Sequence, residues 1–420
     1  MKTSRILALV LVLVLALSLT SMMVKAQDMT VIKIASQSPL SGPQSQLGVG
    51  IRNGVDLAVQ QLSTDLMDMG YEIQYVPYDD QATPDVGVSN AQAIVADDAI
   101  LAVIGHLNSG VAIPSSEVYN ANDLVMVSPA NTNPLVTDRA YPTVNRVCGR
   151  DDLQGPTGAN FADSIEGVES VYILHDTTAY GQGVAEAFQT EAERLELTVL
   201  GFEGTEETAN FDGLIQPILA LEPDLIYMGG IYSQFGIFIN QAAAAGYTGL
   251  YMGPDGFDST ELAELAGDAA VGVYFTSVAG PASLYPNAAQ FIEDYTESFG
   301  EAPTPFAAQA YDATAIALAA IARAAEAAGG VPSRADVASE VRATENYEGL
   351  TSTITFDDNG DPEIGLYYVF QVTEDGVADA DGDGVADWQN ELLQTLEIPS
   401  PLMAAAMAEM EMTPEATTTP

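Results

Sequence analysis

The chain repeats one structural unit from residue 31 onward: a short apolar run rich in β-formers, a polar loop, and a stretch with helical periodicity. Strands that alternate with helices predict parallel sheets covered by helices on both faces. Nine strand-like runs are more than one open sheet of ordinary size needs, so we expect two α/β lobes. The runs are VIKIAS, YEIQYVPY, ILAVIGH, DLVMVSPA, SVYILHD, LTVLGFEG, DLIYMGG, GLYMGP and GVYFTS.

The alternation of strands and helices is interrupted at three places. Residues 141–152 interrupt the alternation and are predicted to form the first crossing between the lobes. After residue 277 the pattern is helical, and it ends in two strands, LTSTITFDD and IGLYYVFQV, that flank the turn at residues 358–361. Past residue 398 the composition is of low complexity, which predicts a disordered tail, with a tether or stalk as the alternative.

The N-terminus carries an export signal. A basic start, MKTSR, precedes an apolar stretch, and VKA offers small residues for cleavage after Ala26, so residues 1–26 are predicted to be a signal peptide. An uncleaved anchor is the alternative, but the apolar stretch is shorter than the roughly 20 residues that span a bilayer. The single cysteine, Cys148, excludes an intrachain disulfide and leaves no lipobox cysteine at the cleavage site. We therefore expect a secreted protein, periplasmic or extracellular.

The charge of the chain limits its partners. With 59 acidic and 12 basic residues, the formal net charge is −47. Such a surface repels nucleic acid and anionic lipid, so neither is an expected partner. The charge itself is typical of solubility in a salty or exposed medium.

Polar side chains collect in the loops that follow the strands. Ligands of open parallel sheets bind beyond the carboxyl ends of the strands, where loops and helix N-termini meet. These loops supply hydroxyls, amides and one carboxylate, a set that suits a small zwitterion. The residues are Ser109, Thr132, Tyr180, Tyr232, Asn108, Asn131 and Asp255.

Each of these residues also has a purely structural interpretation. Ser109 and Thr132 stand where helix N-caps are expected. Tyr180 fits a half-buried loop aromatic, and Asp255 fits a turn residue before a glycine. The two asparagines are common turn formers.

The sequence offers no catalytic residues. In ILHDTTAYGQG, Gly181 and Gly183 resemble part of a dinucleotide fingerprint, but Glu186 occupies the position of the third glycine. The only histidines, His106 and His175, end apolar runs and fit hydrogen-bonding roles at sheet ends. No G-x-S-x-G, Walker A or H-E-x-x-H motif is present, so we expect a protein that is not an enzyme.

The stretch DADGDGVADWQNE resembles a calcium loop. Its carboxylates stand at loop positions 1, 3, 5 and 9, on Asp379, Asp381, Asp383 and Asp387. Position 12 is Asn390 instead of glutamate, which weakens the bidentate ligand. A structural calcium and a solvated acidic turn both remain open, and no other cofactor is expected.

The ordered loops resemble a known family. SPLSGPQSQLG, YDDQATP, GHLNSG, SPANT, DLQGPTGA, ILHDTTAYGQG, YMGG and YMGPDG follow one another as in the periplasmic leucine/isoleucine/valine-binding proteins, the substrate-binding components of branched-chain amino-acid ABC transporters. The resemblance covers nearly all of residues 31–373. It implies the type I periplasmic binding fold: α/β, with two Rossmann-like lobes of parallel sheets, joined by three hinge crossings, that close on a ligand.

The resemblance also suggests how the chain divides. Residues 1–26 are the signal peptide, 27–149 with 279–349 form lobe 1, and 150–278 with 350–373 form lobe 2. Residues 374–397 are an acidic segment with the candidate calcium loop. Residues 398–420 are the disordered tail.

Carried over by position, the family's contacts to the ligand head group fall on Ser109, Ala130, Thr132, Tyr180 and Asp255. The candidate site also includes Leu107, Asn108, Asn131, Tyr232 and Leu47. Asp255 stands where the family usually has glutamate, so it keeps the charge with a shorter reach. Leu47 and Ile231 replace aromatic residues of the family, which puts the side-chain pocket in question.

The resemblance implies an extracytoplasmic solute-binding protein for branched-chain or other aliphatic amino acids. Its partners are the small-molecule amino acid and the permease subunits of an ABC transporter at the membrane, and it is expected to be a monomer. An amide- or urea-binding protein, or a ligand-sensing receptor module of the same fold, is the alternative. A secreted α/β hydrolase is a more distant one.

Overall fold

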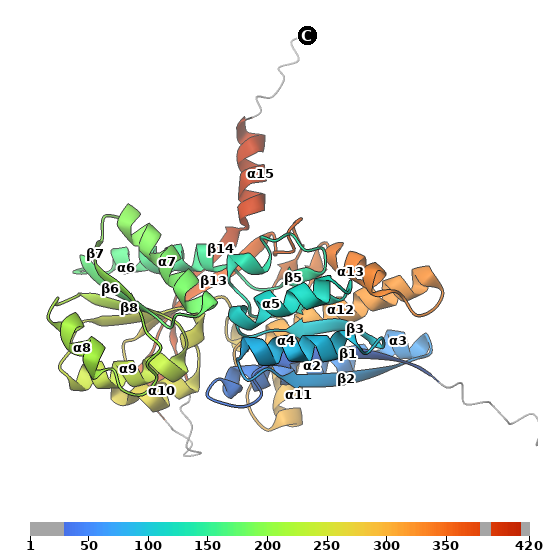
Figure 1. Ribbon diagram of the computed structural model, residues 1–420, viewed down its shortest axis with the longest axis horizontal. Helices are drawn as coiled ribbons and strands as arrows, with labels where there is room; N and C mark the ends of the chain where they lie inside the picture. Colours follow the sequence, from blue (N-terminus) through green and yellow to red (C-terminus); the bar gives the residue numbers. More distant parts are fainter. Residues whose placement is uncertain (1–28, 379–387, 413–420) are drawn as a thin grey trace, which may run out of the picture.

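The computed structural model describes residues 29–378 and 388–412 and shows two α/β lobes side by side (Figure 1). Each lobe has its own sheet with helices on both faces. The predicted fold class, α/β with mostly parallel sheets in two lobes, is confirmed. All nine predicted strands are present, displaced by at most two residues at either end.

Lobe 1 is built on a five-stranded parallel sheet in the order β2-β1-β3-β4-β5. Its strands are β1 (Thr30–Ser38), β2 (Tyr71–Asp79), β3 (Ile100–Gly105), β4 (Val125–Ser128) and β5 (Val144–Arg146). Its helices are α2 (Ser45–Leu62), α3 (Thr64–Asp68), α4 (Pro84–Val95), α5 (Ser109–Asn120), α11 (Ala289–Phe299), α12 (Ala307–Ala328) and α13 (Arg334–Arg342), with the 3₁₀ turns η1 (Pro134–Val136) and η4 (Ala282–Leu284).

The core of lobe 1 explains its sequence pattern. All six residues of the central strand β3, ILAVIG, are buried because helices cover both of its faces. Helices α4 and α5 pack on one face, and α2 and α12 pack on the other. Gly54 lets α2 approach α12 closely, since a Cβ there would lie 2.2 Å from the carbonyl oxygen of Ala307.

Lobe 2 contains a seven-stranded sheet in the order β14-β13-β10-β9-β8-β6-β7. Strands β6 to β10 are parallel, and β13 and β14 add an antiparallel edge. The strands are β6 (Ser170–His175), β7 (Thr198–Gly204), β8 (Leu225–Gly229), β9 (Leu250–Gly253), β10 (Tyr274–Ser277), β13 (Ile364–Gln371) and β14 (Glu391–Pro399). The helices are α6 (Asp151–Ser164), α7 (Ala179–Arg194), α8 (Asp212–Leu219), α9 (Tyr232–Ala244), α10 (Thr260–Ala266) and α14 (Glu374–Val377), with the 3₁₀ turns η2 (Asp255–Phe257) and η3 (Gly267–Ala270).

The chain crosses between the lobes after β5, after β10 and again between α13 and β13. A buried ionic cluster ties the first and third crossings together. Nε of Arg146 lies 2.5 Å from Oδ1 of Asp361, and Nη1 of Arg150 lies 2.7 Å from Oδ2 of the same carboxylate. Arg146 is fully buried, and it also donates to the carbonyl oxygen of Asn131 at 2.8 Å.

The predicted pair of closing strands is only partly right. Residues 364–371 form β13, but β12 (Thr353–Ile354) pairs with β11 (Tyr347–Glu348) instead of with β13. A single bridge, between Phe356 and Pro362, flanks the turn. The turn forms because Gly360 takes φ +92° and the carboxylate of Asp357 accepts three backbone N–H groups.

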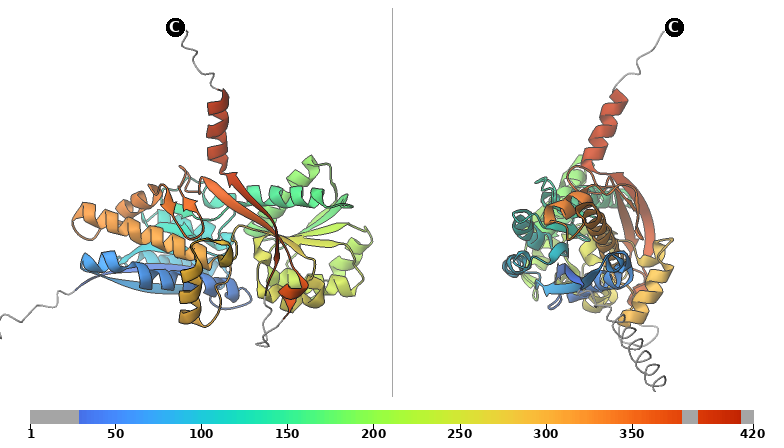
Figure 2. Two further views of the ribbon diagram at one scale, coloured as in Figure 1. Left: turned by 180° about the vertical axis from the view of Figure 1, so that it is seen from behind. Right: turned by 90° about the vertical axis from the view of Figure 1, so that its right-hand side faces the viewer.

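The prediction of disorder from residue 398 is wrong for residues 398–412. Ile398 and Pro399 belong to β14, which covers the outer edge of β13, and α15 (Pro401–Met412) follows. Strand β14 also takes residues 391–397 from the segment predicted to be an acidic loop. The composition of α15, Ala, Met, Leu and Glu, favours a helix strongly, and low complexity hid that preference. Figure 2 shows α15 projecting away from both lobes.

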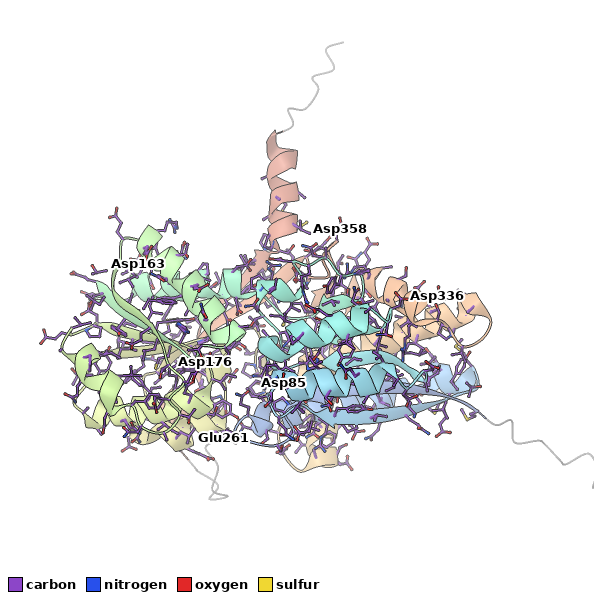
Figure 3. All side chains as sticks on the ribbon, in the orientation of Figure 1. Asp85, Asp163, Asp176, Glu261, Asp336 and Asp358 are labelled. Atoms are coloured by element: carbon purple, nitrogen blue, oxygen red, sulfur yellow. The ribbon has the colours of Figure 1, made fainter. Side chains whose placement is uncertain are left out.

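Two predictions lie outside the described residues. These are the signal peptide at residues 1–26 and the candidate calcium ligands Asp379, Asp381, Asp383 and Asp387. Within residues 29–378 and 388–412, no cluster of three or more His, Cys, Asp or Glu side chains has the arrangement of a metal site. No helix in the same ranges has the length and apolar character needed to cross a membrane. Acidic side chains are spread over both lobes, as Asp85, Asp163 and Asp336 illustrate (Figure 3).

Candidate functional site

A small cavity lies between the lobes, at the carboxyl ends of strands from both sheets. It encloses about 290 Å³ of empty space. Lobe 1 and lobe 2 both supply its walls, so it exists only when the lobes are together. The lining residues are Leu47, Leu107, Asn108, Ala130, Tyr180, Ile231, Asp255, Gly256 and Phe306.

On the lobe 1 side, the cavity faces the N-terminus of α5. Asn108 is the N-cap in an extended conformation, and its side chain makes no capping hydrogen bond. The backbone N–H groups of the first turn, starting at Ser109, have no acceptor within the helix, which makes this end a natural site for an anion. Ser109 and Thr132 are each 1% exposed, and the Thr132 hydroxyl has no partner among the described residues. Neither residue is a helix N-cap, so that interpretation of both is wrong.

Asn131 holds the lobe 1 loops in place and does not line the cavity. Its Oδ1 accepts from the backbone N–H of His106 at 2.9 Å and from the Ser128 hydroxyl at 2.8 Å. Its Nδ2 donates to the carbonyl oxygen of Leu107 at 2.8 Å. These bonds occupy only one of the two amide hydrogens of Asn131, so its predicted contact with the ligand stays a prediction.

On the lobe 2 side, Tyr180 and Asp255 form one unit. The Tyr180 hydroxyl donates to Oδ1 of Asp255 at 2.7 Å and accepts from the backbone N–H of Gly256 at 2.9 Å. Tyr180 is 7% exposed in the first turn of α7, and Asp255 is 4% exposed at the start of η2. Tyr180 is therefore a helix residue and not a loop aromatic, whereas Asp255 does begin a turn before Gly256, as its structural interpretation holds.

Tyr232 lies in the core of lobe 2 and not in the cavity. It is fully buried at the start of α9, and its neighbour Ile231, the N-cap of that helix, lines the cavity instead. The contact of Tyr232 with the ligand stays a prediction, and at this helix start the structure favours Ile231 as the residue that faces the cavity.

Asp151 is a site residue that the sequence analysis missed. It is the first residue of α6 and is fully buried. Its backbone N–H donates to the carbonyl oxygen of Thr132 at 2.9 Å, which places it beside the lobe 1 loops. Neither carboxylate oxygen has a hydrogen-bond partner among the described residues. Acidic residues at a helix start usually interact favourably with the helix dipole, so the sequence alone does not single out Asp151 as a site residue.

Phe306 is the second missed residue. It precedes α12, far along the chain from every strand-end loop, and it is 1% exposed. Its φ of +69° is unusual for an aromatic residue, and strain of this kind gathers at ligand sites. With Leu47, Leu107 and Ile231 it gives the cavity an apolar wall.

The cavity has carboxylates without a cation. Burial raises the pKa of Asp255 to about 6, although hydrogen bonds from Tyr180 and Gln154 lower it in part. Burial and the nearby charge of Asp255 raise the pKa of Asp151 well above its usual range, against smaller effects of Thr132 and Arg146. No Lys, Arg or His lines the cavity, and in the described chain none forms an ion pair with either carboxylate. A ligand with a positive charge would compensate both groups.

Polar contacts between the lobes hold the cavity closed. The Gln46 side chain of α2 bonds to the hydroxyls of Ser259 and Thr260. Nδ2 of Asn133 donates to the carbonyl oxygen of Ala179 at 2.6 Å. Gly183 permits this approach, because a Cβ there would lie 2.7 Å from the Asn133 amide nitrogen. Gly183 thus serves the contact between the lobes, whereas Gly181 permits close packing within lobe 2, where a Cβ would lie 2.4 Å from the carbonyl oxygen of Gly229.

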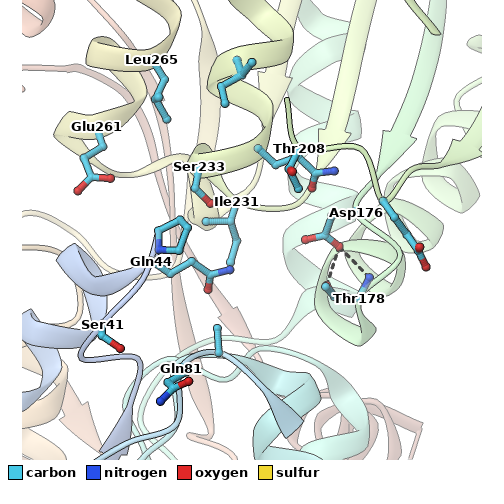
Figure 4. Close-up of a pocket in the computed structure, with 15 residues that line it drawn as sticks. Ser41, Gln44, Gln81, Asp176, Thr178, Thr208, Ile231, Ser233, Glu261 and Leu265 are labelled. Carbon is cyan, nitrogen blue, oxygen red and sulfur yellow. Dashed lines mark hydrogen bonds between the residues drawn. The ribbon is translucent and has the colours of Figure 1, made fainter. Parts of the chain in front are cut away.

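A wider chamber of about 1370 Å³ lies at the mouth of the interface, and Ile231 lines both spaces (Figure 4). Asp176 faces this chamber and accepts from the backbone N–H and the hydroxyl of Thr178, at 2.9 and 2.6 Å. Its role is to fix the turn before α7.

Comparison with known proteins agrees with this geometry. A family model described as periplasmic binding protein matches residues 31–378. The Leu/Ile/Val-binding protein homolog 2 of Brucella abortus is 32% identical over 342 residues, which cover 81% of this chain and 90% of that protein. The leucine-, isoleucine-, valine-, threonine- and alanine-binding protein of Pseudomonas aeruginosa is 30% identical, with 79% of this chain and 87% of the relative covered. A solved leucine-binding protein of Thermotoga maritima matches with a TM-score of 0.76 at 28% identity, covering 87% of this chain and 98% of its own.

Proposed function

Because this chain belongs to the periplasmic binding protein family, we propose that it binds a branched-chain or other aliphatic amino acid between its lobes and delivers it to an ABC transporter permease. The chain is a substrate-binding protein of the ABC transporter class, and its relatives are solute-binding proteins, not enzymes. The ligand and the delivery step are the proposal.

The observation that carries the proposal is the polarity of the cavity. Asp255 lines the cavity and Asp151 lies behind it, close enough for their charges to interact, and neither buried carboxyl group forms an ion pair with a cation of the described chain. The N-terminus of α5 and the unpartnered Thr132 hydroxyl supply hydrogen-bond donors. An α-amino acid carries both matching groups on one carbon, so its ammonium fits the aspartates and its carboxylate fits the donors.

The rest of the wall favours an aliphatic side chain. Leu47, Leu107, Ile231 and Phe306 contribute hydrocarbon surface, and the space is small. Burial of apolar surface contributes about 25 cal/mol per Å², so a branched aliphatic group gains more here than alanine or glycine. Amides and urea offer no cation to the aspartates, which is why we place them second.

The proposal is tested by calorimetric titration with L-leucine and two analogues that each lack one charged group, isoamylamine and 4-methylpentanoate. We expect saturable leucine binding and a loss of at least about a hundredfold for each analogue, because each leaves buried charged or polar groups unpaired. Isoleucine and valine are expected to compete, whereas acetamide and urea are not. Tight binding of 4-methylpentanoate or of an amide alone would refute the amino-acid assignment.

Delivery and localisation need separate experiments. For delivery, the leucine-loaded protein is expected to stimulate ATP hydrolysis by its permease complex in proteoliposomes, whereas a receptor module would leave that rate unchanged. For localisation, the protein recovered outside the cytoplasm is expected to begin at Gln27. An N-terminus that starts at Met1 would contradict cleavage.

A further inference from the structure

A second cavity between the lobes lies apart from the amino-acid cavity, and we name it the seam pocket. It encloses about 750 Å³ and shares no lining residue with the amino-acid cavity. Lobe 1 contributes Gln46 and the loop before α12, and lobe 2 contributes residues near η2, β10 and β13. The lining residues are Gln46, Asp258, Thr260, Phe275, Pro281, Ala302, Pro303, Thr304, Pro305, Phe370, Trp388 and Asn390.

Part of this pocket comes from outside the matched family region, which ends at residue 378. Trp388 and Asn390 follow it and are held against lobe 2 by the backbone. The N–H of Trp388 donates to the carbonyl oxygen of Gly376 at 3.2 Å, and the Thr373 hydroxyl donates to that of Gln389 at 2.6 Å. Residues beyond the region that the family model matches therefore complete one wall of the pocket.

The pocket has an aromatic and proline-rich wall. Phe275 stacks with Trp388 at 6.0 Å between ring centroids and with Phe370 at 5.3 Å. Three prolines, at positions 281, 303 and 305, complete the apolar surface. Such a wall suits a hydrocarbon or aromatic body, and electron-rich rings also attract organic cations.

The polar atoms of the pocket are mostly acceptors. Asp258 is 4% exposed, and its carboxylate accepts from the Trp388 indole N–H at 2.8 Å and from the Ser277 hydroxyl at 3.4 Å. No cation pairs with it in the described chain. The side-chain oxygens of Thr304 and Asn390 are buried without partners among the described residues. An ammonium group carries three donors and a positive charge, which match this set.

We propose that the seam pocket is a second binding site, which takes a small organic amine with a hydrocarbon or aromatic body. Because its walls come from both lobes, the amine binds the closed protein in preference to an open one. By linkage, the amine and the amino acid then strengthen each other's binding. Burial also raises the pKa of Asp258 to about 7, and an ammonium ligand would lower it.

Trp388 makes the test direct, since it is the only tryptophan of the chain. The chain without its predicted signal peptide is titrated with benzylamine, and the indole emission is recorded. We expect a saturable change, with benzyl alcohol, the neutral counterpart, at least about tenfold weaker. Saturating leucine is expected to tighten benzylamine binding.

Two variants separate the pocket from the rest of the protein. Asp258→Asn should weaken benzylamine at least about tenfold and leave benzyl alcohol unchanged. Since that change could disturb the nearby Asp255, Ala302→Phe, an exposed loop position, serves as a second block. It should abolish benzylamine binding while leucine affinity by calorimetry stays within about threefold.

Three outcomes would overturn the proposal. No saturable signal up to about 10 mM benzylamine denies the site. Equal affinity for benzyl alcohol denies the ammonium selectivity. Displacement of benzylamine by leucine, with Ala302→Phe indistinguishable from the native chain, places the amine in the amino-acid cavity.

Discussion

Two sets of buried aspartates in this protein have opposite surroundings. At the hinge, Asp361 is 1% exposed and forms ion pairs with Arg146 and Arg150. Burial alone would raise the pKa of Asp361, but the two guanidinium groups hold that pKa below its usual range. At the cavity, Asp255 in the lining and Asp151 behind it are also buried, form no ion pair with a cation of the described chain, and have raised pKa values.

The presence or absence of a counter-charge distinguishes aspartates that stabilise the fold from aspartates that bind ligand. A buried carboxylate with its counter-charge is a fixed part of the fold, whereas one without it raises the free energy of the ligand-free protein. That free energy is recovered when a ligand supplies the cation. The hinge carboxylate should therefore matter for stability, and the cavity carboxylates should matter for affinity.

The largest effect is expected at the hinge. Asp361→Asn leaves the buried guanidinium of Arg146 without a carboxylate, whereas Arg150 keeps Asp138 and Asp152, so the free energy of unfolding should fall by about 3 to 5 kcal/mol. Urea denaturation followed by circular dichroism measures it. Asp358→Asn, an exposed neighbour, is the control and should stay within about 0.5 kcal/mol. If Asp361→Asn and Asp358→Asn lowered the free energy of unfolding equally, the structural role of the hinge carboxylate would be contradicted.

The matching change in the cavity should act on affinity. Asp255→Asn removes the partner of the ligand ammonium, and a loss of about 2 to 5 kcal/mol in leucine binding follows. Because the native Asp255 pKa lies above its unfolded value, the ionised carboxylate destabilises the free protein at pH values above about 6. The variant should thus be more stable at pH 8 by about 1 to 3 kcal/mol.

Calorimetry and thermal denaturation check both parts, with Asp268→Asn, an exposed residue of lobe 2, as the control. A variant that lost both stability and affinity would indicate a structural role for Asp255.

A smaller effect is expected for Tyr180→Phe. The tyrosine hydroxyl donates to Asp255 and lowers its pKa, so its removal should weaken leucine binding by about 1.5 to 3 kcal/mol. Tyr172→Phe is the matched control, because that hydroxyl donates to the Glu203 carboxylate at 2.9 Å elsewhere in lobe 2. Leucine affinity unaffected by the first change, or reduced equally by both, would count against the role of Tyr180.

The smallest effect is the pH dependence of affinity. Leucine binds to the ionised carboxylates, so its affinity should be constant at high pH. As the pH drops, each carboxylate that becomes protonated should lower the affinity by up to about tenfold per pH unit. For Asp255 the fall begins near pH 6, and Asp151, whose pKa is also raised, adds a second titrating group. Titrations with leucine at pH values from about 5 to about 8 test this dependence. An affinity that does not change over this range would contradict the raised pKa values.

Much of the fold could be predicted because the central parallel strands are covered on both faces and therefore read as apolar runs. Strand β3 is the plainest case. Strand β14 could not be predicted, since its residues are half exposed and its place is set by pairing with β13, an interaction that a local pattern does not contain.

The site was predictable only where it follows a strand. Thr132, Tyr180 and Asp255 follow the carboxyl ends of strands within a few residues, so the rule for parallel sheets finds them. Asp151 begins a helix after a crossing, and Phe306 precedes a helix in the last third of the chain. Phe306 lines the cavity and Asp151 lies beside the lobe 1 loops, and both placements depend on tertiary structure and not on local sequence.

The most direct test counts protons. Leucine binding at pH 6 is measured by calorimetry in two buffers with different ionisation enthalpies, which gives the number of protons released. If the ammonium pairs with carboxyl groups that are partly protonated in the free protein, at least about half a proton should leave per leucine bound, and release should fall in Asp255→Asn. Leucine binding with no proton release, or with the same release in the variant, would contradict an ammonium site built from uncompensated aspartates.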